Sequence, residues 1–513
     1  MTLIQMTATE LKAAIEQGQT SCVEITRAYL DEIGRVDARV NAYLWKGGQS
    51  ALDAAQAVDE RRTRGQDVGL LAGLPVAIKD LLCTRGLRTT CASRMLAEFV
   101  PPYDATVVQR IAQADGVLLG KTNLDEFAMG GSTENSAFGV TRNPWDLDRV
   151  AGGSSGGAAA CVAASTAPLS IGTDTGGSIR QPAAFCGVSG LKPTYGRVSR
   201  YGLVAFASSL DQIGPLGWSV ADLALLLEAI AGHDAADATS ADVPVPAYTR
   251  TVNESLKGLK LGVPREHFDD GLDPAVAKLV QAAIDVYRQQ GAEIREISLP
   301  HSRYAIAAYY IIAPSEASSN LARYDGAHYG YRTDEVKMME EWESERKALE
   351  KAGDDAGLNA LDSPLVRMYR RSRAEGFGAE VKRRIMLGTY ALSAGYYDAY
   401  YLKALKVRRL IRDDYDRAFQ EVDFIVGPVT PSPAFAVGAM IDDPLSLYLQ
   451  DLFTVSANLA GIASLAIPCG LTEQGLPVGL QLQAPPFQEE RLLRAGHMYQ
   501  VETDWHRQRP QLP

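Results

Sequence analysis

Short apolar runs alternate with helical segments along most of this chain, and this alternation limits its fold more than any other feature. Runs of this kind occupy residues 74–79, 116–120, 257–264 and 423–427. Each run is long enough for one strand, and the segments between them are long enough for helices. The pattern predicts an α/β fold.

Three regions outside these runs have a distinct organisation. Residues 7–36 predict two helices, the second beginning with a capping box at Ser21 and Glu24. Residues 233–250, rich in Ala, Asp and Pro, predict an exposed connection. Residues 333–351 are mostly charged and predict an exposed amphipathic helix, whose apolar stripe consists of Val336, Met339, Trp342 and Leu349.

Composition excludes several classes of protein. The 513 residues are 46% hydrophobic and 22% charged, which is ordinary for a globular protein and unlike a disordered or collagen-like chain. The net charge is −11. Because a dedicated nucleic-acid binder usually carries a basic surface, this acidic balance argues against nucleic-acid binding as the main task.

Cysteine usage and hydropathy point to the cytoplasm. None of the six cysteines forms a C-x-x-C pair, so neither a zinc site nor a disulfide framework is expected. The first 20 residues lack the pattern of a signal peptide, and no apolar run reaches 18 residues. We therefore expect no bound metal, no membrane association and a reducing compartment.

Histidine is absent from the first 232 residues, where glycine and serine motifs are concentrated. A serine nucleophile there needs another base to take its proton. Lys79 ends the apolar run 74–79. Burial lowers the pKa of a lysine from its free value of ~10.4, because it disfavours the charged form. A neutral Lys79 is thus the candidate base.

A glycine/serine loop at residues 151–157 leads into an alanine-rich segment. It allows three interpretations: a flexible linker, an anion cradle at a helix N-terminus, or a nucleophile elbow. The elbow pattern G-x-S-x-G is met through Ser154 and again through Ser155. The apolar helix that follows at once disfavours a linker. The polar residues 145–150 disfavour an elbow, which should follow a buried strand.

A second loop, residues 172–180, follows the apolar run 168–171 and includes Ser178. Such a run of small residues can aim several backbone N–H groups at one point, as an oxyanion hole requires. An ordinary turn is the alternative. A Ser-x-x-Lys motif at Ser189 and Lys192 is typical of penicillin-binding enzymes, but their K-T-G element is missing.

Lys79, the motif Gly-Gly-Ser-Ser-Gly-Gly at 152–157 and the motif Gly-Thr-Asp-Thr-Gly-Gly-Ser-Ile-Arg at 172–180 together resemble the amidase signature family. Ser178 follows Ser154 by 24 residues, the family's habitual interval, which selects Ser154 over Ser155. The resemblance covers nearly the whole chain. It implies one amidase domain, residues 1–513, with a mixed central β-sheet flanked by helices on both faces. Residues 333–364 exceed the family pattern, so we expect a charged helical insertion there.

The resemblance also implies a mechanism. Ser178 is expected to attack an amide while Ser154 relays its proton toward a neutral Lys79. The family holds the peptide bond between Gly153 and Ser154 in the cis form. The expected oxyanion hole consists of the backbone N–H groups of Thr175, Gly176, Gly177 and Ser178.

Four further segments, residues 123–135, 200–212, 313–324 and 381–390, resemble one branch of the family, which hydrolyses glutamine for a tRNA-dependent amidotransferase. The resemblance to that branch implies that Arg384 binds the α-carboxylate of glutamine, since arginine binds a carboxylate bidentately. It implies that Asp451 binds the α-ammonium group. Tyr309 and the loop with Met129 and Gly130 lie beside them.

The branch implies partners as well, the amidotransferase subunits B and C. The B subunit holds the misacylated Glu-tRNA(Gln) or Asp-tRNA(Asn) and uses ATP and Mg²⁺, the small C subunit wraps the interface, and ammonia travels through an internal tunnel. This chain itself is expected to need no cofactor. A free-standing amidase acting on another small amide is the alternative, and it would need neither Arg384 nor Asp451. A non-catalytic scaffold is a third interpretation, disfavoured by the presence of Lys79, Ser154 and Ser178.

Overall fold

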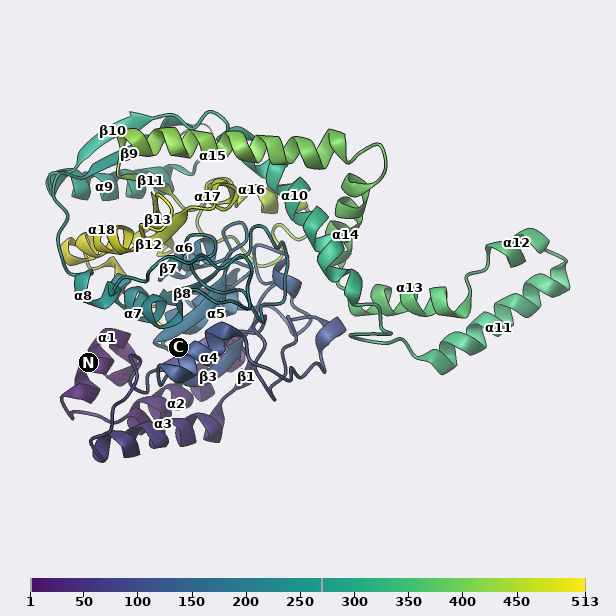
Figure 1. The fold of residues 1–513 in the computed structure, drawn as a ribbon, viewed down its shortest axis with the longest axis horizontal. Coiled ribbons are helices and arrows are strands. Elements are labelled where there is room, and N and C mark those ends of the chain that lie inside the picture. The colour runs from purple at the N-terminus through teal and green to yellow at the C-terminus, as the bar shows by residue number, and fades with distance from the viewer. Residues whose placement is uncertain (1, 269–270, 513) are drawn as a thin grey trace.

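Eleven strands in the described part of the chain form one β-sheet, the layer around which the molecule is built (Figure 1). The computed structural model describes residues 2–268 and 271–512. The strands lie in the order β1-β3-β2-β6-β8-β7-β12-β13-β11-β9-β10. Their bounds are β1 Tyr43–Lys46, β2 Pro75–Lys79, β3 Val117–Thr122, β6 Leu169–Thr173, β7 Ser189–Lys192, β8 Ile213–Gly217, β9 Lys260–Pro264, β10 Glu293–Ile297, β11 Phe424–Pro428, β12 Ala463–Leu471 and β13 Pro477–Ala484. A separate hairpin pairs β4 (Arg142–Asn143) with β5 (Asp146–Val150).

The sheet is mixed. Parallel pairs lie toward its two ends, β3-β2-β6 on one side and β11-β9-β10 on the other, and β1 adds an antiparallel edge strand beside β3. The strands between them, from β6 through β8, β7, β12 and β13 to β11, pair antiparallel. The four apolar runs predicted as strands correspond to β2, β3, β9 and β11, so the α/β fold is confirmed.

Helices surround the sheet (Figure 1). The two helices predicted near the N-terminus are present, and Ser21 and Glu24 cap the second one reciprocally, at 3.1 and 2.9 Å. The apolar positions of that helix, Ile25, Tyr29, Ile33 and Val36, are buried. The helices of the body are α1 Ala8–Glu16, α2 Cys22–Val40, α3 Gly48–Thr63, α4 Thr106–Gln113, α5 Gly156–Ala163, α6 Arg180–Cys186, α7 Val220–Ile230, α8 Tyr248–Thr251, α9 Pro274–Gln289, α10 Ala305–Asn320, α14 Ala379–Leu392, α15 Lys403–Glu421, α16 Pro444–Leu449, α17 Val455–Ala460 and α18 Glu489–Glu502.

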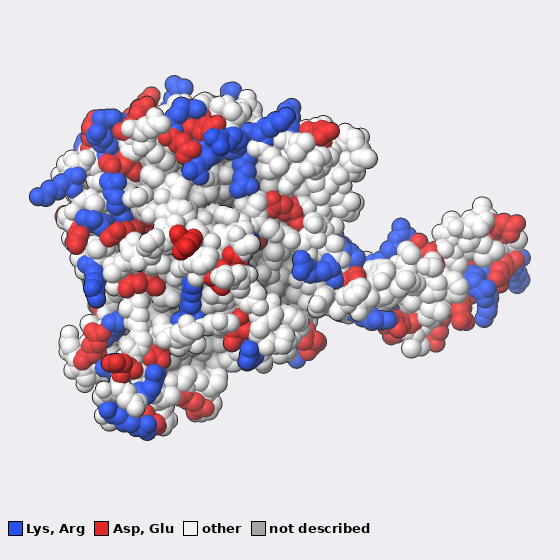
Figure 2. All heavy atoms as spheres, in the orientation of Figure 1, with Lys and Arg blue, Asp and Glu red and all other residues white. Residues whose placement is uncertain are grey.

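An arm projects from this body (Figure 1). It consists of α11 (Glu335–Ala352), α12 (Asp355–Ala360) and α13 (Pro364–Gly376), so it includes most of residues 333–364 and extends beyond them. Ion pairs such as Arg367 with Glu345, at 2.5 Å, join α13 to α11. Basic and acidic side chains are interspersed along the arm (Figure 2).

The apolar stripe predicted for residues 333–351 is wrong at Val336. The side chain of Val336 is 71% exposed, whereas Met338, which the stripe omits, is 2% exposed. In an arm that stands away from the body, few side chains of α11 find a surface to pack against. Helical periodicity gives the spacing of apolar residues but not which of them meet a neighbour.

The connection at 233–250 runs without helix or strand from residue 231 to 247 and then enters α8. Arginines of an earlier loop hold it to the body: the backbone N–H of Arg200 donates to Asp237 Oδ2 (2.8 Å), and the Arg197 side chain donates to the carbonyl of Val243 (3.1 Å). Across the described ranges, no helix is long and apolar enough to cross a membrane.

Candidate active site

Lys79 is the last residue of β2, and its side chain is fully buried. Because β2 pairs in parallel with β6, the two strands end at the same edge of the sheet, and Lys79 lies beside Thr173, the last residue of β6. Its Nζ hydrogen-bonds the hydroxyls of Ser154 (2.8 Å), Ser155 (2.9 Å) and Thr173 (2.8 Å).

The pKa of Lys79 lies near neutral pH. Burial lowers its pKa to about 7, although the carboxylates of Asp125, Asp174 and Asp211 act in the opposite direction. At neutral pH a large fraction of Lys79 is therefore an uncharged amine, the form that can accept a proton.

The loop that carries Ser154 and Ser155 lies directly before α5. As the family resemblance implies, its peptide bond between Gly153 and Ser154 is cis. α5 comes close to the segment after β3, because a Cβ at Gly157 would lie 2.4 Å from the carbonyl oxygen of Asn123. The small residues of 151–157 are thus needed for close backbone approach, which excludes the linker interpretation.

The hydrogen bonds of Ser155 separate its role from that of Ser154. The Ser155 hydroxyl donates to the carbonyl oxygen of Thr173 (2.9 Å), and a hydroxyl carries only one proton. Toward Lys79, Ser155 therefore only accepts. The Ser154 hydroxyl has Lys79 Nζ as its partner, so its proton can pass to the neutral amine. The geometry favours Ser154 as the relay and gives Ser155 the task of fixing Lys79 against β6.

Ser178 lies in the loop between β6 and α6. It is 8% exposed, whereas Lys79 and Ser154 are fully buried, so Ser178 is the most accessible of the three. Among the described residues, no protein acceptor takes a hydrogen bond from the backbone N–H groups of residues 175–178. Four consecutive free donors beside a serine are what a developing oxyanion requires.

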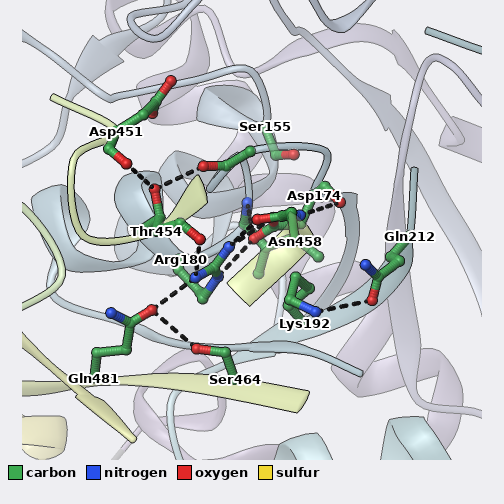
Figure 3. Close-up of polar contacts among 12 residues, drawn as sticks. Ser155, Asp174, Arg180, Lys192, Gln212, Asp451, Thr454, Asn458, Ser464 and Gln481 are labelled. Carbon is green, nitrogen blue, oxygen red and sulfur yellow. Dashed lines mark hydrogen bonds and ion pairs between the residues drawn. The ribbon is translucent and has the colours of Figure 1, made fainter. Parts of the chain in front are cut away.

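An ion pair between Asp174 and Arg180 joins the two ends of this loop. Asp174 and Arg180 are fully buried and meet through two hydrogen bonds of 3.0 Å (Figure 3). Asp174 also accepts from the backbone N–H of Ile179 (3.2 Å) and from the Asn458 amide (2.9 Å). Burial alone would raise the pKa of Asp174, but the charge and hydrogen bonds of Arg180 outweigh it and lower the pKa to about 2. Since Asp174 and Arg180 flank residues 175–179, the pair holds both ends of the loop.

Replacing Arg180 by alanine should therefore destabilise the protein by about 3–5 kcal/mol, because it leaves a buried carboxylate without its cationic partner. The stabilisation is present at neutral pH and should weaken as the pH falls from ~4, the unfolded value of an aspartate, through about 2. Denaturant unfolding at pH 7 measures the effect. The exposed pair of Arg288 and Asp285 provides the control, since Arg288→Ala should change the midpoint little. Equal midpoints for the two variants would contradict the role given to Arg180.

The residues expected to bind an α-amino acid meet around one tyrosine. The guanidinium of Arg384, on α14, lies 5.4 Å from the ring of Tyr310, and the hydroxyl of Tyr310 donates to Asp451 Oδ2 (3.1 Å). Burial raises the pKa of Asp451 to about 7, although this hydrogen bond and the charge of Arg384 lower it. Tyr309, the preceding residue, packs on residues 174–180, the candidate oxyanion loop, since a Cβ at Gly176 would lie 2.6 Å from its ring.

The loop with Met129 and Gly130 lies against the serine loop. Gln181 joins the two: its amide nitrogen donates to the carbonyl of Gly131 (2.7 Å), and its oxygen accepts from the N–H of Gly153 (2.9 Å). A Cβ at Gly130 would lie 2.3 Å from the Asp125 carboxyl group, so this position requires glycine. The side chain of Met129 is fully buried in the core.

Comparison with known proteins shows the family of this chain. The family model described as Amidase matches residues 24–493. The chain belongs to the amidase family. It is 56% identical to the A subunit of the glutamyl-tRNA(Gln) amidotransferase of Moorella thermoacetica, over 100% of this chain and 99% of the relative, and 57% identical to the protein of the same name from Rhodopirellula baltica, over 98% and 97%. The crystal structure of the same amidotransferase component from Thermotoga maritima superposes with a TM-score of 0.76 at 38% identity, covering 98% of this chain and 96% of that one.

Within this amidase, several residues of the site were not predicted from the sequence. Thr173 and Ser155 hold Lys79, Asp174 and Arg180 hold the oxyanion loop, and Thr454 Oγ1 donates to the carbonyl of Gly176 (2.6 Å). Asp174, Thr173 and Arg180 belong to the conspicuous motif 172–180, which is the signal that points to them. Thr454 and Tyr310 carry no local signal, because each reaches the site from a distant segment.

Proposed function

We propose that this chain is the glutamine-hydrolysing subunit of a tRNA-dependent amidotransferase. The observation that carries the proposal is the position of Arg384 and Asp451 around Tyr310, joined through Tyr309 to the oxyanion loop. A cation and a carboxylate in this arrangement suit the α-carboxylate and α-ammonium groups of a free amino acid. The names of the relatives support glutamine as that amino acid.

The reaction proceeds in two halves. Ser178 Oγ bonds to the carboxamide carbon of glutamine while its proton passes to Ser154, whose own proton passes to the neutral Nζ of Lys79. The carbonyl oxygen becomes an oxyanion facing the N–H groups of residues 175–178. Ser154 then donates a proton to the leaving nitrogen and regains one from Lys79 Nζ. The nitrogen departs as ammonia and leaves a glutamyl ester on Ser178. Water, activated by the same relay, then cleaves the ester and releases glutamate.

The ammonia is consumed elsewhere. In the proposed complex, the B subunit holds Glu-tRNA(Gln) or Asp-tRNA(Asn) and activates its carboxyl group with ATP and Mg²⁺, and the C subunit completes a cytoplasmic heterotrimer. The acidic net charge of this chain, −11, supports a division of labour in which the tRNA phosphates are bound mainly by another chain. No cofactor takes part in the glutaminase steps derived above.

Glutamine-dependent amidation of the two misacylated tRNAs tests this function. It is measured with this chain alone and with subunits B and C co-expressed. Amidation by the assembled complex only, on either tRNA, is the expected result. Hydrolysis of another amide by the chain alone, with no complex formed, would instead favour a free-standing amidase.

Replacing Arg384 by alanine should lower kcat/KM for glutamine by roughly 30- to 1,000-fold, chiefly by raising KM, because the substrate carboxylate loses a charged bidentate partner. Glutaminase kinetics in the assembled complex measure the change. Arg383 is the matched control, since it is the preceding residue of α14 and its side chain is 41% exposed. If Arg384→Ala and Arg383→Ala have equal kinetics, Arg384 does not bind the substrate.

A further inference from the structure

The amino-acid pocket contains a second carboxylate that the function proposed above does not use. Glu380 lies one helical turn before Arg384 on α14, and its side chain is only 6% exposed. Its Oε1 accepts a hydrogen bond from Arg384 Nε (2.7 Å) and another from the hydroxyl of Tyr448 (2.8 Å). One oxygen atom thus anchors side chains from two separate elements, α14 and α16.

The contact with Tyr448 extends to the other side of the pocket. The ring of Tyr448 stacks on that of Tyr310, with centroids 3.9 Å apart and an angle of 18°. The hydroxyl of Tyr310 in turn donates to Asp451 (3.1 Å). A continuous chain of contacts therefore runs from Glu380 through two tyrosines to the residue expected to bind the α-ammonium group.

Two hydrogen-bonding groups orient Arg384: the Glu380 carboxylate and the hydroxyl of Tyr448, which Glu380 itself holds. The rings of Phe206, Tyr310 and Tyr448 lie 5.4–5.5 Å from the guanidinium carbon. Ring faces attract a cation but do not fix its rotation as a hydrogen bond does. Arginine has five N–H donors in a rigid fork. Since Glu380 engages Nε, the end-on pair of nitrogens, Nη1 and Nη2, is directed to the opposite side and can take a second carboxylate.

We propose that Glu380 is a positioning residue for substrate selection: it orients Arg384 toward the α-carboxylate and, through Tyr448 and Tyr310, sets the place of Asp451. This inference rests on the proposed function, because it assumes that Arg384 and Asp451 bind the amino-acid end of glutamine. Glu380 touches neither the reacting carboxamide nor the triad. Its loss should therefore weaken binding of substrates with α-groups and leave the chemistry of the amide intact.

The test compares Glu380→Ala and Glu380→Gln in the complex with subunits B and C, using glutamine and propionamide, a primary amide without α-groups. Glu380→Ala should raise KM for glutamine roughly 10- to 100-fold with kcat within about threefold of the parent. Glu380→Gln, which keeps an acceptor oxygen, should recover part of that loss. The kcat/KM for propionamide should be the same in all three proteins.

Arg383→Ala is the control, because it removes the exposed partner of Glu380 and leaves Arg384 paired. An unchanged KM for glutamine in both Glu380 variants would overturn the inference. So would equal losses for glutamine and propionamide, since these would mean a general collapse of the site. Failure of the proposed function is distinguishable from either result, because the parent complex would then not hydrolyse glutamine, or Arg384→Ala would leave KM unchanged.

Discussion

Replacing Ser178 by alanine should abolish glutamine hydrolysis, lowering kcat by at least about 10⁴-fold. The Oγ atom that bonds to the carboxamide carbon is lost, and neither Ser154 nor Lys79 can take its place because both are fully buried. Stability should hardly change, within about 0.5 kcal/mol, since the side chain is small and not completely buried. Ammonia release by the purified complex and thermal unfolding of the same samples measure the two effects.

Ser155→Ala is the informative companion to Ser178→Ala. Ser155 accepts a hydrogen bond from Lys79 but passes no proton, so Ser155→Ala should lower kcat far less than the loss of Ser178 or Ser154.

Ammonia supplied directly should restore tRNA amidation by the Ser178→Ala complex, because the partner's chemistry does not need this residue. Undiminished glutaminase activity of Ser178→Ala would refute the mechanism.

The second large effect is the pH dependence of glutamine hydrolysis, which is set by Lys79 as the base. The kcat for glutamine should fall as the pH drops below about 7, since the pKa of Lys79 is lowered to about 7 by burial and only the neutral amine accepts a proton. The sign follows from the direction of the shift: above this pKa the amine is neutral and active, and below it the ammonium form cannot act as base. Replacing Lys79 by methionine should remove the pH dependence together with roughly 10²- to 10⁴-fold of the rate.

The pH profile must be taken on kcat to isolate Lys79. Asp451 also titrates in the free enzyme, where burial raises its pKa to about 7, and it contributes to kcat/KM. Once a substrate ammonium group pairs with Asp451, that carboxylate stays ionised, and kcat reports the bound complex. Asp125→Asn removes a negative charge that raises the pKa of Lys79, so it should move the midpoint to lower pH. A midpoint that stays in place in Lys79→Met would show that another group is the base.

Several strands, one helix start and two loops of this protein could be predicted from its sequence, because the patterns that indicate them are local. The apolar runs predicted β2, β3, β9 and β11, and the capping box predicted the start of α2 at Cys22. The motifs at 152–157 and 172–180 indicated two loops of small residues, and the structure has such loops directly before α5 and α6. Short-range sterics and capping operate within a few residues, so a sequence displays them directly.

The pairing of the site residues was decided by tertiary structure. Lys79 meets Thr173 because β2 lies parallel to β6 in the sheet, and no local pattern specifies which strands become neighbours. Glu380, Tyr448 and Tyr310 form one network from three segments that are individually unremarkable. Val336, expected in the apolar stripe of an exposed helix, finds no surface to pack against for the same reason. The sequence by itself determined strands, caps and tight loops, whereas burial, partners and the pKa of Lys79 depend on distant residues that only the folded chain brings together.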